Sequence, residues 1–297
     1  MKLIAAMSGG VDSSVAAALA LRQSHEVIGV TLRLKHPDPD FSAAQLCVGR
    51  SDEAAVLSVC AALGMEHRFV ERFPAFSERV LRPAALEYLA GLTPNPCCNC
   101  NELVKFATLF EIADELGADG VLTGHYARIE RASGDVRLLR GSDPAKDQTY
   151  FLYRLRRWML ARLYFPVGDL TKPEVRKEAA KMGLVTAEKR DSQDACFQVP
   201  GECFGETLRR LFELAPKPGN FVYRGRAVGR HGGIHQYTLG QRKGLGVALG
   251  VPAYVAAIDA ITGDIVLETE EGVLLKDSFR VGAVNSLLAG SFPERMQ

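Results

Sequence analysis

The chain has 297 residues, which is long for one hydrophobic core and predicts two or three domains. Its composition (47% hydrophobic, 24% charged) is that of a globular protein, and no apolar run approaches the roughly 20 residues of a membrane span. The net charge of +1 gives no overall field for nucleic acid, and without a signal-peptide pattern we expect a cytoplasmic protein whose seven cysteines stay reduced.

The first predicted elements are a buried strand over Leu3–Met7 and a helix over Asp12–Arg22. The sequence Ser8-Gly9-Gly10-Val11-Asp12-Ser13-Ser14 joins them. Glycines let the backbone approach an anion, and the amides of a first helical turn point toward it. The segment lacks the Walker A lysine and the G-x-G-x-x-G spacing, so a plain tight turn is the alternative to a nucleotide-binding loop.

The next elements alternate between strands and helices. Strands are predicted at Glu26–Leu34, Glu66–Val70 and Gly120–Thr123, a Pro-containing loop at 36–50, and helices at 51–63, 75–89, 102–116 and 172–182. This alternation predicts a parallel sheet with crossover helices. Because ligands bind at the carboxyl ends of such strands, we expect Gly9–Asp12, Leu32 and Gly124-His125 to line one pocket.

The composition changes from Pro216 onward, where glycines become frequent. Short strands are predicted at Phe221–Tyr223, Tyr254–Ile258 and Asp264–Leu267, so we place a domain boundary near 204–211 and expect a smaller β-rich domain after it. No acidic residue lies between Glu213 and Asp259, a window that contains Lys217, Arg224, Arg226, Arg230, Arg242 and Lys243. Such a local basic surface suits a partner with phosphates, and a solvated charged face is the alternative.

Three of the seven cysteines, Cys97, Cys98 and Cys100, follow two prolines. Asn101 is expected to begin a helix whose N-terminal field lowers the pKa of a neighbouring thiol. The Cys97-x-x-Cys100 spacing fits a redox pair, half of a zinc site or part of an iron–sulfur site, although no second ligand pair suits zinc. The cysteines at 47, 60 and 203 are interpreted as small buried apolar residues.

The loop at 8–14 resembles the pyrophosphate loop of the ATP pyrophosphatases, which adenylate a substrate oxygen. Six segments resemble the tRNA-specific 2-thiouridylase family, in the family's order and across nearly the whole chain. They are residues 8–14, 93–106, 124–127, 146–152, 191–197 and 237–245.

The resemblance implies an α/β fold with a doubly wound parallel sheet of the adenine nucleotide alpha hydrolase type over residues 1–208. It further implies a β-rich central domain over 209–279 and the start of an incomplete C-terminal β-barrel over 280–297. The implied reaction uses ATP and Mg²⁺ to adenylate the C2 oxygen of the wobble uridine of tRNA and replaces that oxygen with sulfur. A sulfur donor, such as a cysteine desulfurase or a sulfur-relay protein, is the expected second partner.

The resemblance also assigns site residues. Cys100 matches the family's nucleophile, Cys196 matches its persulfide carrier, and Asp12 is expected to act in adenylation. The implied ATP-binding residues are Ala6, Met7, Ser8, Gly9, Gly10, Val11, Asp12, Ser13, Leu32 and Gly124. Contacts with tRNA or its target base are implied for Asn95, Pro96, Cys97, His125, Lys146, Asp147 and Gln148.

One departure leaves the sulfur source open. Many family members have Asp where this chain has Cys97. Cys97, Cys100 and Cys196 therefore form an alternative set of ligands for three irons of a [4Fe–4S] cluster, which would deliver sulfur in place of a persulfide. Two further hypotheses are a pyrophosphate-loop ligase and a nucleotide-sensing or RNA-binding module without activity.

Overall fold

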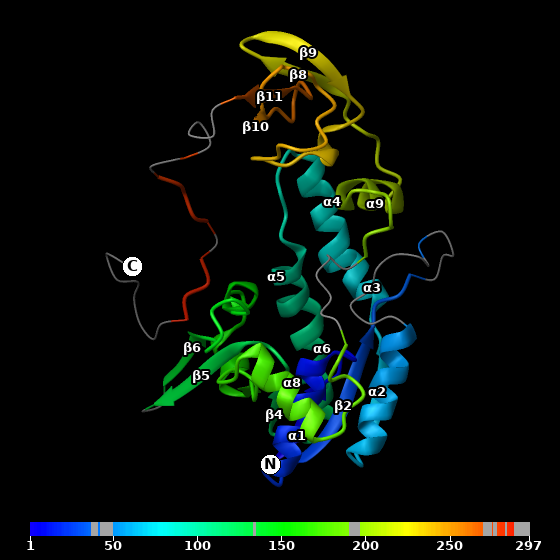
Figure 1. The fold of residues 1–297 in the computed structure, drawn as a ribbon, viewed down its shortest axis with the longest axis vertical. Coiled ribbons are helices and arrows are strands. Elements are labelled where there is room, and N and C mark those ends of the chain that lie inside the picture. The colour runs from blue at the N-terminus through cyan, green and yellow to red at the C-terminus, as the bar shows by residue number, and fades with distance from the viewer. Residues whose placement is uncertain are drawn as a thin grey trace.

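The computed structural model describes residues 1–36, 41, 50–132, 135–189, 197–269, 275, 278–282 and 284–287. Its larger part contains a five-stranded sheet in the order β3-β2-β1-β4-β7, in which every neighbouring pair is parallel (Figure 1). The strands are β1 (Lys2–Ala6), β2 (Glu26–Arg33), β3 (His67–Glu71), β4 (Gly120–Leu122) and β7 (Leu163–Tyr164). The parallel sheet predicted from the alternating pattern is confirmed.

Helices cover both faces of this sheet. Four of them are α1 (Val11–Arg22), α2 (Arg50–Ala62), α7 (Arg157–Ala161) and α8 (Lys172–Lys181). Successive side chains of a strand point to opposite faces. Accordingly Leu3 and Ala5 of β1 pack in one apolar cluster with α1, α2 and α8. Ile4, between them, packs in a second cluster on the other face.

Two long helices each contain a π-helical turn. One runs through α3 (Phe73–Phe76), η2 (Ser77–Leu81) and α4 (Arg82–Leu89), and the other through α5 (Pro96–Cys100), η3 (Asn101–Phe106) and α6 (Ala107–Glu115). The predicted start of the second helix was wrong. It begins at Pro96, in keeping with the preference of proline for the first helical position.

Three strands of this part were not predicted. The strands β5 (Ala127–Ala132) and β6 (Asp135–Arg140) form an antiparallel hairpin, and the two-residue β7 completes the parallel sheet at its edge. A short 3₁₀ helix, η4 (Thr149–Leu152), follows the hairpin and contacts α5 and η3.

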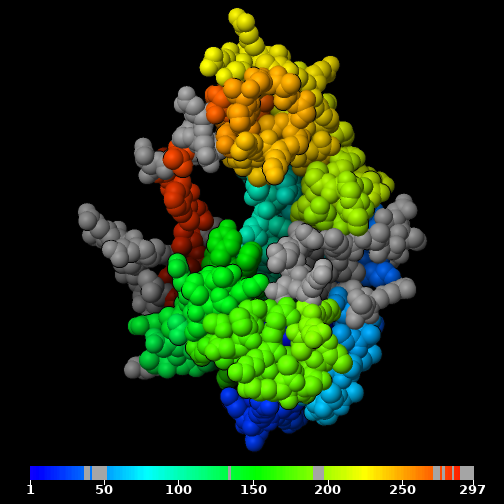
Figure 2. All heavy atoms as spheres, viewed as in Figure 1, coloured from blue at the N-terminus to red at the C-terminus, as the bar shows by residue number. Residues whose placement is uncertain are grey.

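The β-rich part is a four-stranded sheet in the order β10-β11-β8-β9. Its strands are β8 (Gly219–Tyr223), β9 (Arg226–His231), β10 (Tyr254–Ile258) and β11 (Ile265–Glu268). Only the β11–β8 pair is parallel among these, and β9 was not predicted. Figure 2 shows this part, in yellow and orange, at one end of the molecule and the blue-to-green α/β part at the other.

The residues expected to form a domain boundary are a helix, α9 (Phe204–Leu211). It packs against α4 and against η5 (Ile234–Gln236) of the β-rich part. At Gly205 the two backbones come so close that a Cβ atom would lie 2.0 Å from the carbonyl oxygen of His235. The expected limit at residue 208 falls inside α9.

Candidate active site

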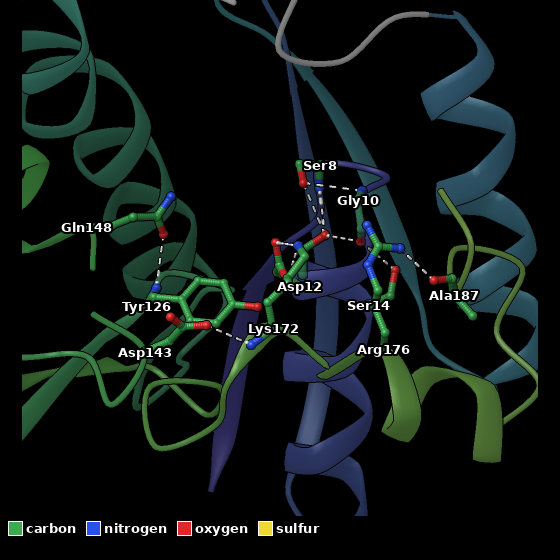
Figure 3. Close-up of polar contacts among 11 residues, drawn as sticks. Ser8, Gly10, Asp12, Ser14, Tyr126, Asp143, Gln148, Lys172, Arg176 and Ala187 are labelled. Carbon is green, nitrogen blue, oxygen red and sulfur yellow. Dashed lines mark hydrogen bonds and ion pairs between the residues drawn. The ribbon is translucent and has the colours of Figure 1, made fainter. Parts of the chain in front are cut away.

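The turn between β1 and α1 is held by its own serine hydroxyl groups. The hydroxyls of Ser13 and Ser14 donate to the carbonyl oxygen of Gly10 at 3.0 and 2.9 Å, and the Ser8 and Ser13 hydroxyls lie 3.1 Å apart (Figure 3). The backbone N–H of Ser8 also donates to the Ser13 hydroxyl. These bonds fix the shape of the turn, so the N-terminus of the 12-residue helix α1 faces the carboxyl end of β1.

Two glycines allow neighbouring backbones to approach this turn. Gly9 has a φ of +74°, and a Cβ atom there would lie 2.6 Å from the Asp52 carbonyl oxygen. Gly124 follows β4, and a Cβ atom there would lie 2.5 Å from the backbone of Asp12 and Ser13. Since real Cβ atoms do not come this close to backbone atoms, only glycine fits at either position.

We expect Gly124→Ala to weaken ATP binding at least about tenfold and to cost about 1–3 kcal/mol of folding free energy, because the methyl group pushes β4 away from α1. Titration calorimetry with ATP and chemical denaturation measure the two effects. The matched control is Gly232→Ala, because a Cβ atom at Gly232 would have no neighbour within 4 Å. Equal ATP affinity in the two variants would contradict the tight fit inferred at Gly124.

The carboxylate of Asp12 is bound by two residues that sequence reasoning missed. The Lys172 ammonium group lies 2.8 Å from each of its oxygens, and the Tyr126 hydroxyl donates to Oδ1 at 2.7 Å (Figure 3). Tyr126 and Lys172 are both buried. The backbone N–H of Lys172, at the start of α8, donates to the buried carboxylate of Asp143 at 2.9 Å. A network from three distant chain segments thus fixes Asp12 beside the turn.

A second contact ties the turn to the segment after α8. The Lys189 ammonium group donates to the carbonyl oxygen of Gly9 at 2.8 Å and forms an ion pair with Asp52 of α2. Nearby, Arg176 of α8 donates to the carbonyl oxygen of Ala187 at 2.7 Å (Figure 3). Lys189 thus adds a second ammonium group to that of Lys172 at the turn, and Arg176 fastens the segment that follows α8.

A pocket of about 230 Å³ opens at the carboxyl ends of β1, β2 and β4. Its lining includes most of the residues expected to bind ATP, although Gly9, Gly10 and Val11 are not among them. The lining contains both apolar side chains and polar groups. The full lining is Ala6, Met7, Ser8, Asp12, Ser13, Val30, Leu32, Leu34, Lys105, Phe106, Leu109, Thr123, Gly124, His125 and Gln148.

His125 lies in this pocket, with its Nδ1 atom 2.7 Å from the Thr123 hydroxyl. Burial, together with a smaller contribution from the nearby positive charge of Lys105, lowers the pKa of His125 to about 3. The imidazole is therefore neutral at physiological pH. It suits hydrogen bonding to a ligand rather than pairing with a phosphate charge.

The low pKa of His125 predicts a pH dependence of stability. Its unfolded pKa is near 6.5, so the unfolded state takes up the proton first as pH falls. The contribution of neutral His125 to the free energy of unfolding is complete above about pH 6.5. It is lost progressively toward pH 3, at up to about 1.4 kcal/mol per pH unit. Chemical denaturation at several pH values gives the free energy of unfolding as a function of pH. Between pH 7.5 and 4.5, this free energy should fall less steeply for His125→Asn than for wild type. Parallel curves would show that His125 does not titrate this way.

Lys105 is a further pocket residue that sequence reasoning missed. It lies on η3 and is half-buried, and no ion pair joins it to a carboxylate within the described ranges. A cation in a pocket without a carboxylate partner favours an anionic ligand. Lys105 lies five positions after Cys100 in a continuous helix, so the thiol-bearing helix also forms a wall of the pocket.

The three cysteines of α5 differ in exposure. Asn95 precedes the helix, Pro96 is its first residue, Cys97 is half-buried, and Cys98 and Cys100 are buried. Burial raises the pKa of the Cys98 thiol to about 11. Burial also raises the pKa of Cys100, and Lys105 offsets this only in part. The expectation of a thiol acidified by a helix starting at Asn101 was wrong, because the helix starts at Pro96 and surrounds Cys100 with apolar side chains.

Cys196 lies outside the described residues, as does Cys47. Phe197, the next residue after Cys196, is fully buried in the apolar cluster that contains Cys100. Its φ of +70° is uncommon for a bulky side chain. Two other cysteines were expected to be buried. Cys60 is buried, whereas Cys203 is exposed, so the expectation for Cys203 was wrong.

The segment Lys146-Asp147-Gln148 lies beside the pocket, and two of its side chains bind the protein itself. Asp147 accepts hydrogen bonds from Gly141 and Thr149, and these keep its pKa low although burial raises it. The Gln148 side chain accepts from the backbone N–H of Tyr126 at 2.9 Å (Figure 3). Asp147 and Gln148 thus shape the loop that carries them.

Within the part of the chain that the structure describes, no group of three or more His, Cys, Asp or Glu side chains is placed to hold a metal ion. Two of the three expected cluster ligands, Cys97 and Cys100, belong to that part, and Cys196 does not. The described helices include none that is both long enough and apolar enough to cross a bilayer.

Two family models match the chain. Residues 1–200 match the tRNA methyl transferase HUP domain, and residues 211–268 match the tRNA methyl transferase PRC-barrel domain. The tRNA-specific 2-thiouridylase MnmA of Sorangium cellulosum is 46% identical over 91% of this chain and 70% of its own length. That of Roseiflexus sp. is 43% identical over 99% of this chain and 83% of its own length.

Among solved structures, a 4-thiouridine synthetase in complex with RNA and ATP is similar with a TM-score of 0.43 and 17% identity. The match covers 71% of this chain and 50% of that one.

Proposed function

The chain belongs to the tRNA-specific 2-thiouridylase family, and on that premise we propose that it uses ATP to convert the wobble uridine of tRNA into 2-thiouridine. One observation carries the proposal. The helix that bears Cys100 continues into Lys105, Phe106 and Leu109, which line the pocket at the β1–α1 turn. A nucleotide-activating site and a thiol thus share one helix. Thiolation accounts for both features, whereas methyl transfer would leave them without a role.

The pocket offers ATP both apolar side chains and polar groups. Leu32, Leu34 and Leu109 offer apolar surface for an adenine ring, and the turn at Ser8–Ser13 offers backbone N–H groups for phosphate. Lys105 and the Lys172–Asp12 pair add charge at the same site. Mg²⁺ would be held mainly by the phosphates, with Asp12 as a carboxylate of the pocket lining, and would neutralise their charge.

The chemistry requires two half-reactions. The C2 oxygen of uridine is a poor leaving group, so it first attacks the α-phosphorus of ATP and releases pyrophosphate. The terminal sulfur of a Cys196 persulfide then attacks C2, and the C2–O bond breaks with its electron pair on the oxygen of AMP. The Cys100 thiolate next attacks the Cys196 sulfur and breaks the S–S bond. A Cys100–Cys196 disulfide remains, which an external thiol reduces.

The packing of Phe197 supports this pairing of thiols. Phe197 and Cys100 share one apolar cluster, and consecutive Cα atoms are about 3.8 Å apart. The residue that follows Cys196 in the sequence is therefore anchored in the cluster that holds Cys100. The disulfide that we propose needs Cα atoms within about 7 Å of each other. The persulfide on Cys196 comes from a sulfur-donor protein.

Delivery of sulfur from a [4Fe–4S] cluster is the alternative. Cys97 and Cys100 are three residues apart on one helix, and residues at that spacing share a face. Iron and labile sulfide analysis of anaerobically purified protein, with Cys97→Ala for comparison, separates the two routes. A cluster that disappears with Cys97 would favour the alternative. Full anaerobic activity without iron would exclude it.

The function itself is tested by incubating the protein with ATP, Mg²⁺, a sulfur donor and unmodified tRNA. We expect 2-thiouridine and pyrophosphate in equal amounts, measured by nucleoside mass spectrometry and a pyrophosphate assay. Pyrophosphate without thiolation would favour a pyrophosphate-loop ligase. The absence of both products would favour a module that only binds nucleotide or RNA.

A further inference from the structure

Two aromatic side chains are exposed beside the helix that carries Cys97, Cys98 and Cys100 and continues through η3, which we call the cysteine helix. Tyr150 and Tyr153 leave 65% and 46% of their surface open to solvent, and their ring centroids lie 6.3 Å apart. Both belong to the segment Tyr150–Arg156, which starts in η4 and lies alongside α5 (Figure 1). Exposed apolar side chains that lie next to one another often mark a binding surface.

The segment Tyr150–Arg156 is fastened to the cysteine helix at three points. The amide group of Asn101 donates to the carbonyl oxygen of Phe151 at 2.9 Å. The Cys98 thiol lies 3.7 Å from the carbonyl oxygen of Tyr150. The third point is Glu102, whose carboxylate binds two arginines of the segment. The two exposed tyrosines are therefore held at a fixed position relative to the cysteines.

The contacts of Glu102 also leave positive charge next to the two tyrosine rings. Glu102 is buried, and its carboxylate accepts from Arg154 at 2.7 Å and from Arg156 at 3.1 Å. One carboxylate thus pairs with two guanidinium groups, so these three side chains carry a net charge of +1. Arg156 keeps 60% of its side chain exposed. Aromatic rings with an adjacent cation form the kind of surface that binds unpaired nucleotides, through stacking on the bases and attraction to the phosphates.

We propose that Tyr150 and Tyr153 form a stacking platform for unpaired bases of the tRNA anticodon loop, next to the uridine that reacts. The proposal rests on the proposed function and adds to it the residues that hold the neighbouring bases. The platform positions the loop relative to Cys100, because the segment Tyr150–Arg156 and the cysteines are joined through Cys98, Asn101 and Glu102. Both tyrosines are positioning residues.

The test measures the binding of an unmodified anticodon stem-loop RNA by fluorescence anisotropy at several salt concentrations. The double variant Tyr150→Ala/Tyr153→Ala should bind at least about tenfold more weakly than wild type, because each stacked base contributes on that order. The double Phe variant should bind within about twofold of wild type. The salt dependence of RNA binding should be the same in wild type and in these variants, since stacking neutralises no phosphate. Leu57→Ala, an exposed apolar truncation on α2, is the matched control.

A double Leu variant guards against misfolding, because leucine keeps the apolar bulk without a flat ring, and it should bind as weakly as the Ala variant. Binding of the Leu or Ala variant within twofold of wild type would overturn the proposal, as would an equal loss in the Phe variant. If wild-type protein forms 2-thiouridine while the Ala variant binds RNA normally, only the platform fails. If wild-type protein forms no 2-thiouridine, the proposed function fails instead.

Discussion

Asp12→Ala is expected to reduce ATP-dependent pyrophosphate release by at least about 100-fold, the scale on which removal of one positioned charged group acts in an active site. The Asp12 carboxylate lines the pocket and holds Lys172 and Tyr126 beside the turn. Without it, the proposed phosphate site loses its fixed cation and its carboxylate together. A pyrophosphate assay at saturating ATP and tRNA measures the effect.

The same substitution should also destabilise the protein. It leaves the buried Lys172 ammonium group without its carboxylate, at a cost of about 1–3 kcal/mol because the pair is partly open to water. The charge-balanced double variant Asp12→Asn/Lys172→Met should recover most of this stability and none of the pyrophosphate release. Recovery of release in the double variant, or normal release in Asp12→Ala, would show that the carboxylate only supports the fold.

The second large effect is expected for the thiols. Cys100→Ser should lower 2-thiouridine formation by at least about 10³-fold, because a serine hydroxyl cannot replace the thiolate that releases the sulfur. Cys196→Ser should do the same. Both variants should still bind ATP and release pyrophosphate, since the thiols act only in the second half-reaction. Nucleoside mass spectrometry and the pyrophosphate assay, run on the same sample, separate the two steps.

Cys203→Ser is the matched control for the thiol variants. Cys203 is exposed, precedes α9 as its N-cap, and lies in a position where serine is favoured. Its replacement should leave thiolation within about twofold of wild type, as expected for a surface change. Thiolation retained in Cys100→Ser or Cys196→Ser would refute the paired-thiol assignment.

The parts of the fold that were predictable are those with a strong local pattern. Apolar runs with nearby glycines located β1, β2 and β4, and periodic helices located α1 and α8. β7 was missed because a strand of two residues carries no pattern of its own and is defined by its pairing with β4. The start of α5 was missed because two prolines and three cysteines give no helical periodicity.

The site was predictable where its residues lie in one continuous motif. The glycines and hydroxyls of Ser8–Ser14 predicted a tight turn between a strand and a helix, and the resemblance gave that turn its expected role in binding phosphate. Lys172 and Tyr126 were missed because they reach Asp12 from 160 and 114 positions away, and no local pattern encodes that contact. Lys105 was missed for the same reason, because only the packing of η3 against the sheet brings it into the pocket.

The central claim is that the uridine oxygen leaves with AMP, and isotope transfer tests it most directly. An anticodon stem-loop RNA labelled with ¹⁸O at C2 of the wobble uridine is incubated with the protein, ATP, Mg²⁺ and a sulfur donor. We predict that each 2-thiouridine formed yields one AMP that carries the ¹⁸O label, detected by mass spectrometry. Unlabelled AMP accompanying 2-thiouridine, or ¹⁸O retained in the RNA while ATP is cleaved, would contradict the account.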